Sequence, residues 1–286
     1  MIMAEAENRR RREHSRSTER LSAHYRVEKD LANKLRTATK DERKGLYPLL
    51  YDELYRKVPD HPQIVRKTSP ADSEAAVIRQ MRLIRRFLNP ETTFLEVGAG
   101  DCALAFRVAE IVSSVYAVDV SEMITNASRI PENFTLALSD GCSIPVTGNS
   151  IDVAYSYQLM EHLHPDDAYE QLVNIYACLK PGGRYICETP SRLNGPHDIS
   201  SFFDSVASGF HLKEYTFGEL EDLFHQAGFS SISPYVGIKG RYFGVPQEIV
   251  RTTETTIEFF QRNFQRWISK RLPCRLLLGV PIVATK

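Results

Sequence analysis

From residue 90 onward, short apolar runs alternate with stretches of helical periodicity. The apolar runs predict strands at Thr93–Val97, Ser114–Val118, Phe134–Ala137, Ile151–Ser156 and Gly183–Glu188. One helix is expected from Pro165 to the turn at Lys180-Pro181-Gly182-Gly183, and another from Thr216 to Ala227, with a Thr216/Glu219 capping box. Continuous apolar strands separated by helices indicate a parallel sheet that is covered on both faces.

The pattern before residue 90 is helical. Residues 1–45 are charge-dense, with six arginines against two glutamates between Arg9 and Arg20, and read as a solvated, frayed, disordered or helical arm, with contact to an anionic partner as the alternative. Residues 46–90 predict a helical cap, in which interleaved leucines and tyrosines are followed by an amphipathic helix with Ser73 as its N-cap. Residues 91–286 then form the core domain.

A further helix is expected as an insertion at about residues 245–271. Its aromatic positions lie on one side, with Ile257, Phe260, Phe264 and Trp267 at helical spacing. The most apolar stretch, Leu276–Ala284, is too short to span a bilayer.

Composition narrows the classes of function. The formal net charge is zero, so we expect no nucleic-acid partner on electrostatic grounds. The five cysteines are widely spaced and lack a C-x-x-C pair, which argues against a disulfide framework and a structural zinc site and favours a cytoplasmic location. Nothing in the sequence indicates the oligomeric state.

A glycine-rich loop follows the first strand. Gly98 and Gly100 allow a tight turn and a close approach of ligand to backbone, and the helix that follows offers free N–H groups to an anionic moiety. Asp119 ends the second strand 21 residues after Gly98, where a carboxylate can accept hydrogen bonds from ribose hydroxyls. This pattern also fits a dinucleotide fingerprint with Ala103 in the third position, so a nucleotide-cofactor (NAD-type) oxidoreductase is one alternative.

A series of further motifs, in order and at similar spacing, resembles the class I S-adenosylmethionine (SAM)-dependent methyltransferases, particularly small-molecule enzymes of the ubiquinone-biosynthesis type. The motifs are Leu95-Glu96-Val97-Gly98-Ala99-Gly100, Tyr116 to Met123, Ser139-Asp140-Gly141, Asp152 to Ser156, Glu161-His162-Leu163 and Leu179 to Gly183. The resemblance implies a Rossmann-like, doubly wound, mostly parallel seven-stranded sheet with an N-terminal helical extension. Where the family commonly has a third glycine this chain has Cys102, expected beside the methionine portion of the cofactor.

The resemblance also implies how SAM, and its product S-adenosylhomocysteine, would be held. Glu96, Gly98, Ala99 and Gly100 would line the methionine end, and Asp119 would bind the ribose, with Val120 and Met123 beside the adenine. Asp140 would accept from the adenine amino group next to Gly141, and Tyr157 and Gln158 would form the floor beneath the sulfonium. For Asp140, a turn-capping role is the alternative. A second alternative for the whole chain is a catalytically weak SAM-binding protein.

Three histidines are candidates for proton removal from an acceptor hydroxyl, namely His162, His197 and His211. His162 follows the fourth strand, where bracing of the loop is an equal alternative, and the other two lie in the long polar loop after the fifth strand. His164, Asp166 and Asp167 beside His162 suggest a metal site, but acids in a first helical turn have another reason to be there, and we predict no metal.

The identity of the methyl acceptor is not readable from the sequence. Three aromatic-containing segments could cover the methyl group: Tyr47–Tyr55, Arg192–His211 and Ile257–Trp267. Aromatic cover and zero net charge favour a small-molecule acceptor, methylated on oxygen, over a macromolecule.

Overall fold

The computed structural model describes residues 16–67, 69–121 and 130–286. Parallel pairing joins β1 (Thr93–Val97), β2 (Ser114–Asp119), β3 (Phe134–Leu138), β4 (Ile151–Tyr157) and β5 (Leu179–Glu188). Beyond β5 the sheet turns antiparallel through β8 (Ile282–Thr285), β6 (Ser231–Ile238) and β7 (Arg241–Gly244), giving the order β3-β2-β1-β4-β5-β8-β6-β7. The predicted α/β class is confirmed, with eight strands in place of seven because β6 and β7 form an edge hairpin.

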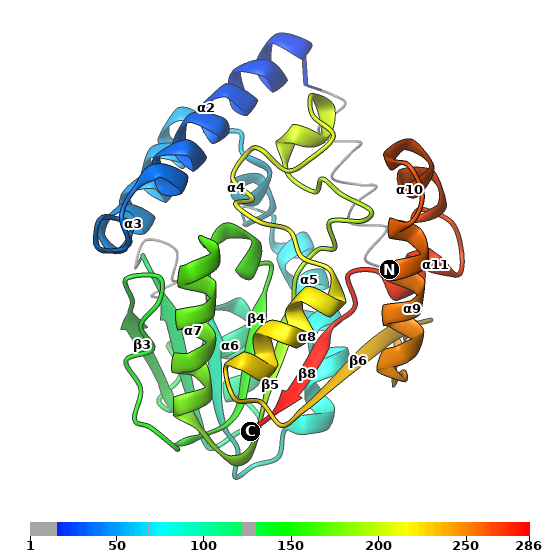
Figure 1. The fold of residues 1–286 in the computed structure, drawn as a ribbon. Helices are drawn as coiled ribbons and strands as arrows, with labels where there is room; N and C mark the ends of the chain where they lie inside the picture. Colours follow the sequence, from blue (N-terminus) through cyan, green and yellow to red (C-terminus); the bar gives the residue numbers. More distant parts are fainter. Residues whose placement is uncertain (1–15, 68, 122–129) are drawn as a thin grey trace.

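Helices cover both faces of this sheet, as Figure 1 shows. One face carries α7 (Pro165–Cys178) and α8 (Phe217–Gln226), and the other carries α5 (Pro70–Ile84) and α6 (Ala103–Ala109). Two hydrophobic clusters fill the layers, one around Ile175 and Phe224 and the other around Val77 and Leu104. The predicted capping box of α8 is present, because Glu219 N–H donates to Thr216 Oγ1 at 3.1 Å and Thr216 N–H donates to the Glu219 carboxylate.

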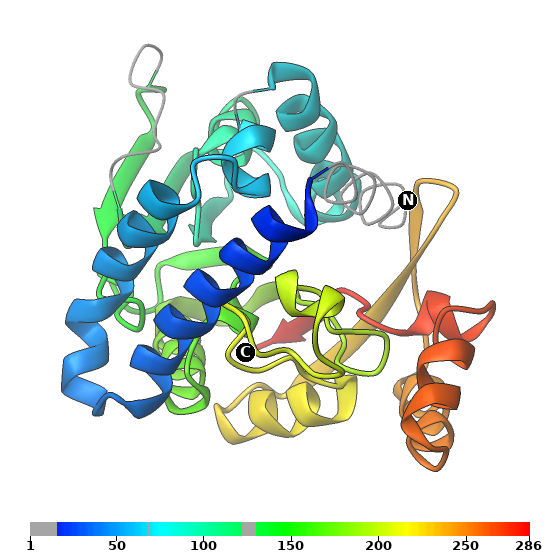
Figure 2. The same ribbon diagram turned by 90° about the horizontal axis from the view of Figure 1, so that it is seen from above.

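The N-terminal helices pack against the core domain. They are α2 (Thr18–Thr37), α3 (Lys40–Lys57) and α4 (Pro62–Lys67), and Figure 2 shows α2 and α3 running side by side across the domain. Of the alternatives expected for residues 1–45, the helical one applies to Thr18–Thr37, and this helix is packed and not solvated all round, since Leu31, Ala32 and Leu35 are buried. The stripe is hard to see in the sequence because the buried face of α2 also includes the polar residues His24 and Glu28. Residues 1–15, with the four arginines from Arg9 to Arg12, lie outside the described part.

Two local predictions need correction. The N-cap of α5 is Ser69, whose hydroxyl accepts from Asp72 N–H, and Ser73 lies one turn inside the helix. The single helix expected at residues 245–271 is broken into α9 (Gln247–Glu258) and α10 (Arg262–Ile268), followed by α11 (Cys274–Leu277). Its aromatic residues Phe259, Phe264 and Trp267 are exposed, so helical spacing here does not mark a buried face. In the described ranges, no helix is long and apolar enough to cross a membrane.

Candidate active site

A cavity of about 810 Å³ lies at the carboxyl ends of β1, β2 and β4. This volume lies within the range of small-molecule sites, about 300–1,000 Å³. One wall is the predicted cofactor loop together with the ends of the strands, with Glu96, Gly98, Ala99, Gly100, Asp119, Val120, Gly141, Tyr157 and Gln158. The opposite wall comes from the N-terminal helices α3, α4 and α5. The predicted cofactor residues are therefore largely brought together, and Met123 lies outside the described residues.

The glycine loop is held open by hydrogen bonds to β2. Gly98 N–H donates to Val118 O at 2.8 Å, and Gly100 N–H donates to Asp119 Oδ2 at 2.8 Å. Both glycines have positive φ, 73° and 56°, where a Cβ would be strained. Asp119 Oδ1 accepts from the backbone of Val120 at 2.7 Å, so the carboxylate is positioned on the cavity wall before any ligand arrives.

The side chain of Cys102 points into the core and not toward the expected methionine site. The residue has a left-handed backbone, with φ 57°, so it adopts the conformation that a glycine would provide. Its side chain is fully buried in the cluster formed with Leu104 and Val108, and it is not among the cavity-lining residues. Cysteine in place of the family's usual glycine therefore adds a side chain to the core behind the loop and none to the cavity wall.

Glu96 carries an unpartnered carboxylate oxygen on the cavity wall. The residue is buried, and Oε2 has no hydrogen-bond partner within the described chain. Burial, reinforced by the charge of Asp101, raises the pKa of the Glu96 carboxyl well above its ordinary value. A cationic ligand group would satisfy this oxygen and restore its charge, which suits the α-ammonium of the methionine moiety.

Asp140 is placed differently from its neighbour Gly141. Its Oδ1 accepts from Cys142 and Ser143 N–H at 3.0 and 2.7 Å, and it does not line the cavity. These bonds match the turn-capping alternative. Gly141 does line the cavity, and a Cβ there would lie 2.7 Å from the Tyr47 ring, so the approach of α3 requires glycine at this position.

Of the three predicted covering segments, only the tyrosine-rich one reaches the cavity. Tyr47, Tyr51 and Tyr55 line it from α3. The segments Arg192–His211 and Ile257–Trp267 contribute no lining residue. The cover therefore comes from the N-terminal helices.

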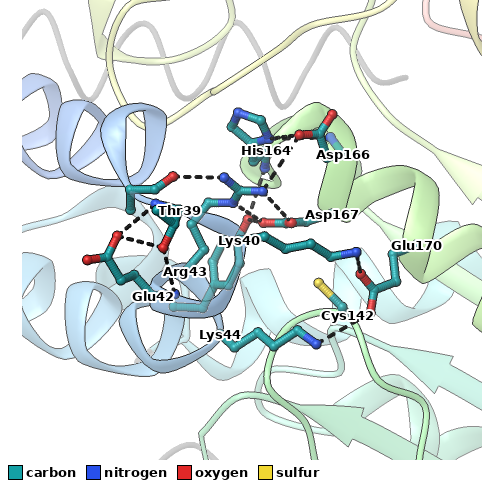
Figure 3. Close-up of polar contacts among 12 residues, drawn as sticks. Thr39, Lys40, Glu42, Arg43, Lys44, Cys142, His164, Asp166, Asp167 and Glu170 are labelled. Atoms are coloured by element: carbon teal, nitrogen blue, oxygen red, sulfur yellow. Dashed lines mark hydrogen bonds and ion pairs between the residues drawn. The ribbon is translucent and has the colours of Figure 1, made fainter.

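Helix α3 is anchored beside the cavity by a buried ion pair, drawn in Figure 3. Arg43 donates through Nε and Nη2 to both carboxylate oxygens of Asp167, at 2.6 and 2.8 Å, and Tyr47 Oη also donates to Asp167. His164 caps α7 by accepting from Asp166 N–H. Of the acids that follow His162 in sequence, Asp167 anchors α3, and Asp166 contributes its backbone N–H to the cap of α7.

The three candidate bases occupy different surroundings. His162 lines the cavity, and its Nδ1 donates to Phe210 O at 3.0 Å. His197 and His211 lie away from the lining, and both contact Glu214: His197 through its backbone N–H and His211 through Nδ1, at 2.7 and 2.8 Å. Burial and the nearby His211 lower the pKa of His162 to about 3. Burial opposes protonation of His211, but its hydrogen bond with Glu214 and the Glu214 charge raise its pKa to about 9.

Several lining residues were missed by sequence reasoning. Ser73, Ala76 and Gln80 of α5 face the cavity together, and Gln63 joins them from α4. Their spacing of three and seven residues along α5 places them on one helical face, which was a readable signal. It was overlooked because the apolar stripe of the same helix dominated the pattern.

Comparison with known proteins agrees with this geometry. Residues 95–187 match the methyltransferase domain family. A SAM-dependent methyltransferase of Thermotoga maritima, described as a possible histamine N-methyltransferase, has a similar fold, with 15% identity, a TM-score of 0.51, and coverage of 85% of this chain and 99% of that chain. Phosphoethanolamine N-methyltransferase 1 of Haemonchus contortus, in complex with phosphoethanolamine and S-adenosylhomocysteine, is also similar, with 15% identity, a TM-score of 0.56, and coverage of 87% and 50%. A SAM-dependent methyltransferase of Archaeoglobus fulgidus gives 17% identity, a TM-score of 0.50, and coverage of 74% and 94%. No curated protein matches the sequence.

The family match places a methyltransferase domain within the core of this protein. Residues 95–187 form a SAM-dependent methyltransferase domain, and S-adenosylmethionine is its cofactor. The dinucleotide alternative is thereby resolved in favour of SAM. Asp119 and the unpartnered Glu96 oxygen place two carboxylates on the cavity wall, and the assignment of Asp119 to the ribose and of Glu96 to the α-ammonium stays a prediction.

Replacing Asp119 with alanine should weaken SAM binding about tenfold to a hundredfold, since a hydrogen bond to a charged group contributes roughly 1.5–3 kcal/mol. Titration calorimetry with SAM measures the effect. Asp152→Ala is a suitable control, because Asp152 pairs with Lys180 outside the cavity lining. Unchanged affinity in a folded Asp119→Ala protein would remove Asp119 from the site.

Proposed function

We propose that this protein transfers the methyl group of SAM to a small molecule held in the same cavity, and that the atom methylated is oxygen. One observation carries the proposal: a single cavity extends from the glycine loop to His162 beneath the tyrosines of α3. Reaction by in-line displacement needs the acceptor aligned with the methyl group, and one cavity that holds both molecules favours such alignment. The subgroup similar to ubiquinone-biosynthesis enzymes and a cytoplasmic location stay predictions.

His162 is the residue that we assign to the acceptor hydroxyl. Because Nδ1 donates to a carbonyl, the neutral imidazole presents the lone pair of Nε2. With its pKa near 3, the ring is neutral at physiological pH and can accept a hydrogen bond from the hydroxyl, although it is a weak base. His197 and His211 lie away from the cavity lining and would act only through other groups.

An assay with methyl-labelled SAM tests the acceptor class. The purified protein is incubated with a metabolite extract, with whole-cell protein and with RNA, and the label is followed in each fraction. We expect label in small molecules, and less of it with Asp119→Ala when SAM is below the saturating concentration. Label only in protein or RNA would overturn the small-molecule acceptor and leave the methyltransferase assignment in place.

Replacing His162 with glutamine should lower kcat about a hundredfold or more once an acceptor is known, by analogy with removal of a positioned proton-transfer group, while leaving the affinity for SAM unchanged. His225→Gln is the matched control, because His225 is exposed and is not one of the cavity-lining residues. Equal turnover by the two variants would exclude a role for His162 in the reaction.

A further inference from the structure

We propose that Glu161, His162 and His211 bind a divalent transition-metal ion beside the part of the cavity that His162 lines. One ligand atom from each of these three side chains lies within 4.8 Å of the other two. All three residues are buried, and His162 lines the cavity. The proposal revises the expectation of no metal. It also deepens the proposed function, on which its catalytic part rests: with the ion bound at His162 Nε2, the ion would receive the acceptor oxygen in place of the imidazole lone pair.

The backbone brings the two halves of this cluster together. Glu161 and His162 belong to the 3₁₀ turn Met160–His162 after β4, whereas His211 lies in the loop before α8. Leu212 and Lys213 N–H both donate to Glu161 O, at 2.7 and 3.2 Å. The rings of His162 and His211 consequently meet edge to face, with 4.8 Å between their centroids.

Both imidazoles are oriented as metal-binding histidines are. His162 Nδ1 donates to a backbone carbonyl and His211 Nδ1 donates to the Glu214 carboxylate. This pattern orients each ring and makes Nε2 the atom that it would offer to a metal, and binding would release the Nε2 proton that His211 otherwise carries.

Glu161 supplies a second, independent indication of a missing ligand. It is 0% exposed, and its Oε2 accepts from Thr189 Oγ1 at 2.9 Å. Its Oε1 is buried without any partner in the described residues. An orphaned carboxylate oxygen in a protein interior is costly, and a cation would satisfy it.

A second buried cluster, His24–Glu28–His61, lacks this arrangement. There Glu28 Oε1 already accepts from both imidazoles, at 2.7 and 3.2 Å, and Glu28 Oε2 accepts from Phe210 N–H. His24 Nδ1 lies 2.9 Å from Arg16 Nη1, a group that can only donate. Each Nε2 therefore carries the proton, and this cluster serves as a built-in comparison.

Two nitrogens and one carboxylate favour Zn²⁺, Mn²⁺ or Fe²⁺ over Mg²⁺ or Ca²⁺. Three protein ligands leave coordination positions for an acceptor oxygen entering from the cavity. A hydroxyl bound there would lose its proton to solvent more readily, and its oxygen would bond to the methyl carbon as the sulfur–carbon bond breaks. The products are the methyl ether, S-adenosylhomocysteine and one proton, with no change in the metal's oxidation state.

Metal binding can be tested without any acceptor. The full-length protein is stripped with a chelator, dialysed and titrated with ZnCl₂ or MnCl₂ by calorimetry. One equivalent is expected to bind the wild-type protein, with at least tenfold weaker binding in Glu161→Gln and His211→Gln, since even groups behind metal ligands typically change affinity 10–100-fold. His24→Gln is the matched control and should retain wild-type binding. Circular dichroism establishes that each variant is folded.

The possible outcomes separate the two proposals. Absence of stoichiometric binding by the wild-type protein, or equal binding by Glu161→Gln, would overturn the metal site, and the orphan oxygen would then face a protonated His211. Loss of binding in His24→Gln alone would move the ion to the other cluster and likewise overturn it. Stoichiometric binding without methyl transfer to any small molecule would leave the metal site and refute the proposed acceptor class.

Discussion

Gly100→Val is expected to reduce SAM affinity on the order of a hundredfold or more while the fold survives. Gly100 has a φ of 56° and lies on the cavity wall, so a β-branched side chain is strained there and occupies space that the methionine moiety needs. The same substitution disturbs the bond from Gly100 N–H to Asp119, the residue assigned to the ribose. Calorimetric titration with SAM measures the loss.

Gly182 provides a matched control for backbone strain. It also has a positive φ, 78°, and a Cβ there meets nothing within 4 Å. Gly182→Val should therefore share the backbone penalty and retain SAM binding. If both variants bound SAM equally, whether well or poorly, the loss could not be assigned to the cavity, and the glycine loop would lose its role.

Arg43→Ala is expected to lower the free energy of unfolding by about 3–5 kcal/mol, as typically found when one partner of a buried ion pair is removed. The side chains of Arg43 and Asp167 are 4% and 1% exposed. The substitution removes the guanidinium from the buried Asp167 carboxylate, which keeps its hydrogen bond from Tyr47 Oη. Urea denaturation followed by circular dichroism measures the change. Lys44→Ala is the control, because its ion pairs at 3.6 and 4.0 Å are partly exposed and should contribute under about 1 kcal/mol.

The same ion pair predicts a pH dependence with a definite sign. Burial alone would raise the pKa of Asp167, but hydrogen bonds from Arg43 and Tyr47 and the guanidinium charge lower it overall. The stabilisation is therefore complete above the unfolded-state pKa of about 3.9 and is lost as the pH falls through the folded-state value. Asp167→Asn should accordingly be less stable than wild type at pH 7, with the difference shrinking below about pH 4. A constant difference across this range would contradict the assignment.

Some features of this protein depend only on neighbouring residues, and these were predictable from sequence. The strand before Gly98, the carboxylate at the end of β2 and the capping box of α8 follow from local periodicity and local hydrogen bonding. The position of the cofactor residues at one edge of the sheet was also predictable, because parallel strands bring their carboxyl ends together.

Other features depend on contacts between distant segments. Arg43 and Asp167 are 124 positions apart, and nothing near either one marks the partner. Polar residues on the buried face of α2 hide its stripe, whereas the exposed aromatics of α10 imitate one. Hydropathy measures the free energy of transferring a side chain out of water. Whether a polar side chain is buried depends also on whether a group far away in the sequence can form a hydrogen bond or ion pair with it.

The candidate metal site combines both kinds of information. The sequence places Glu161 and His162 after β4 and His211 in a polar loop, but the distance between them in space cannot be read from it. Hydrogen bonds from Leu212 and Lys213 to Glu161 O bring His211 beside the pair, and Glu214 and Phe210 O orient the rings. Residue types determined which chemistry is available, and only the tertiary structure decided which side chains meet, because loop conformation is set by backbone partners that lie far away in the chain.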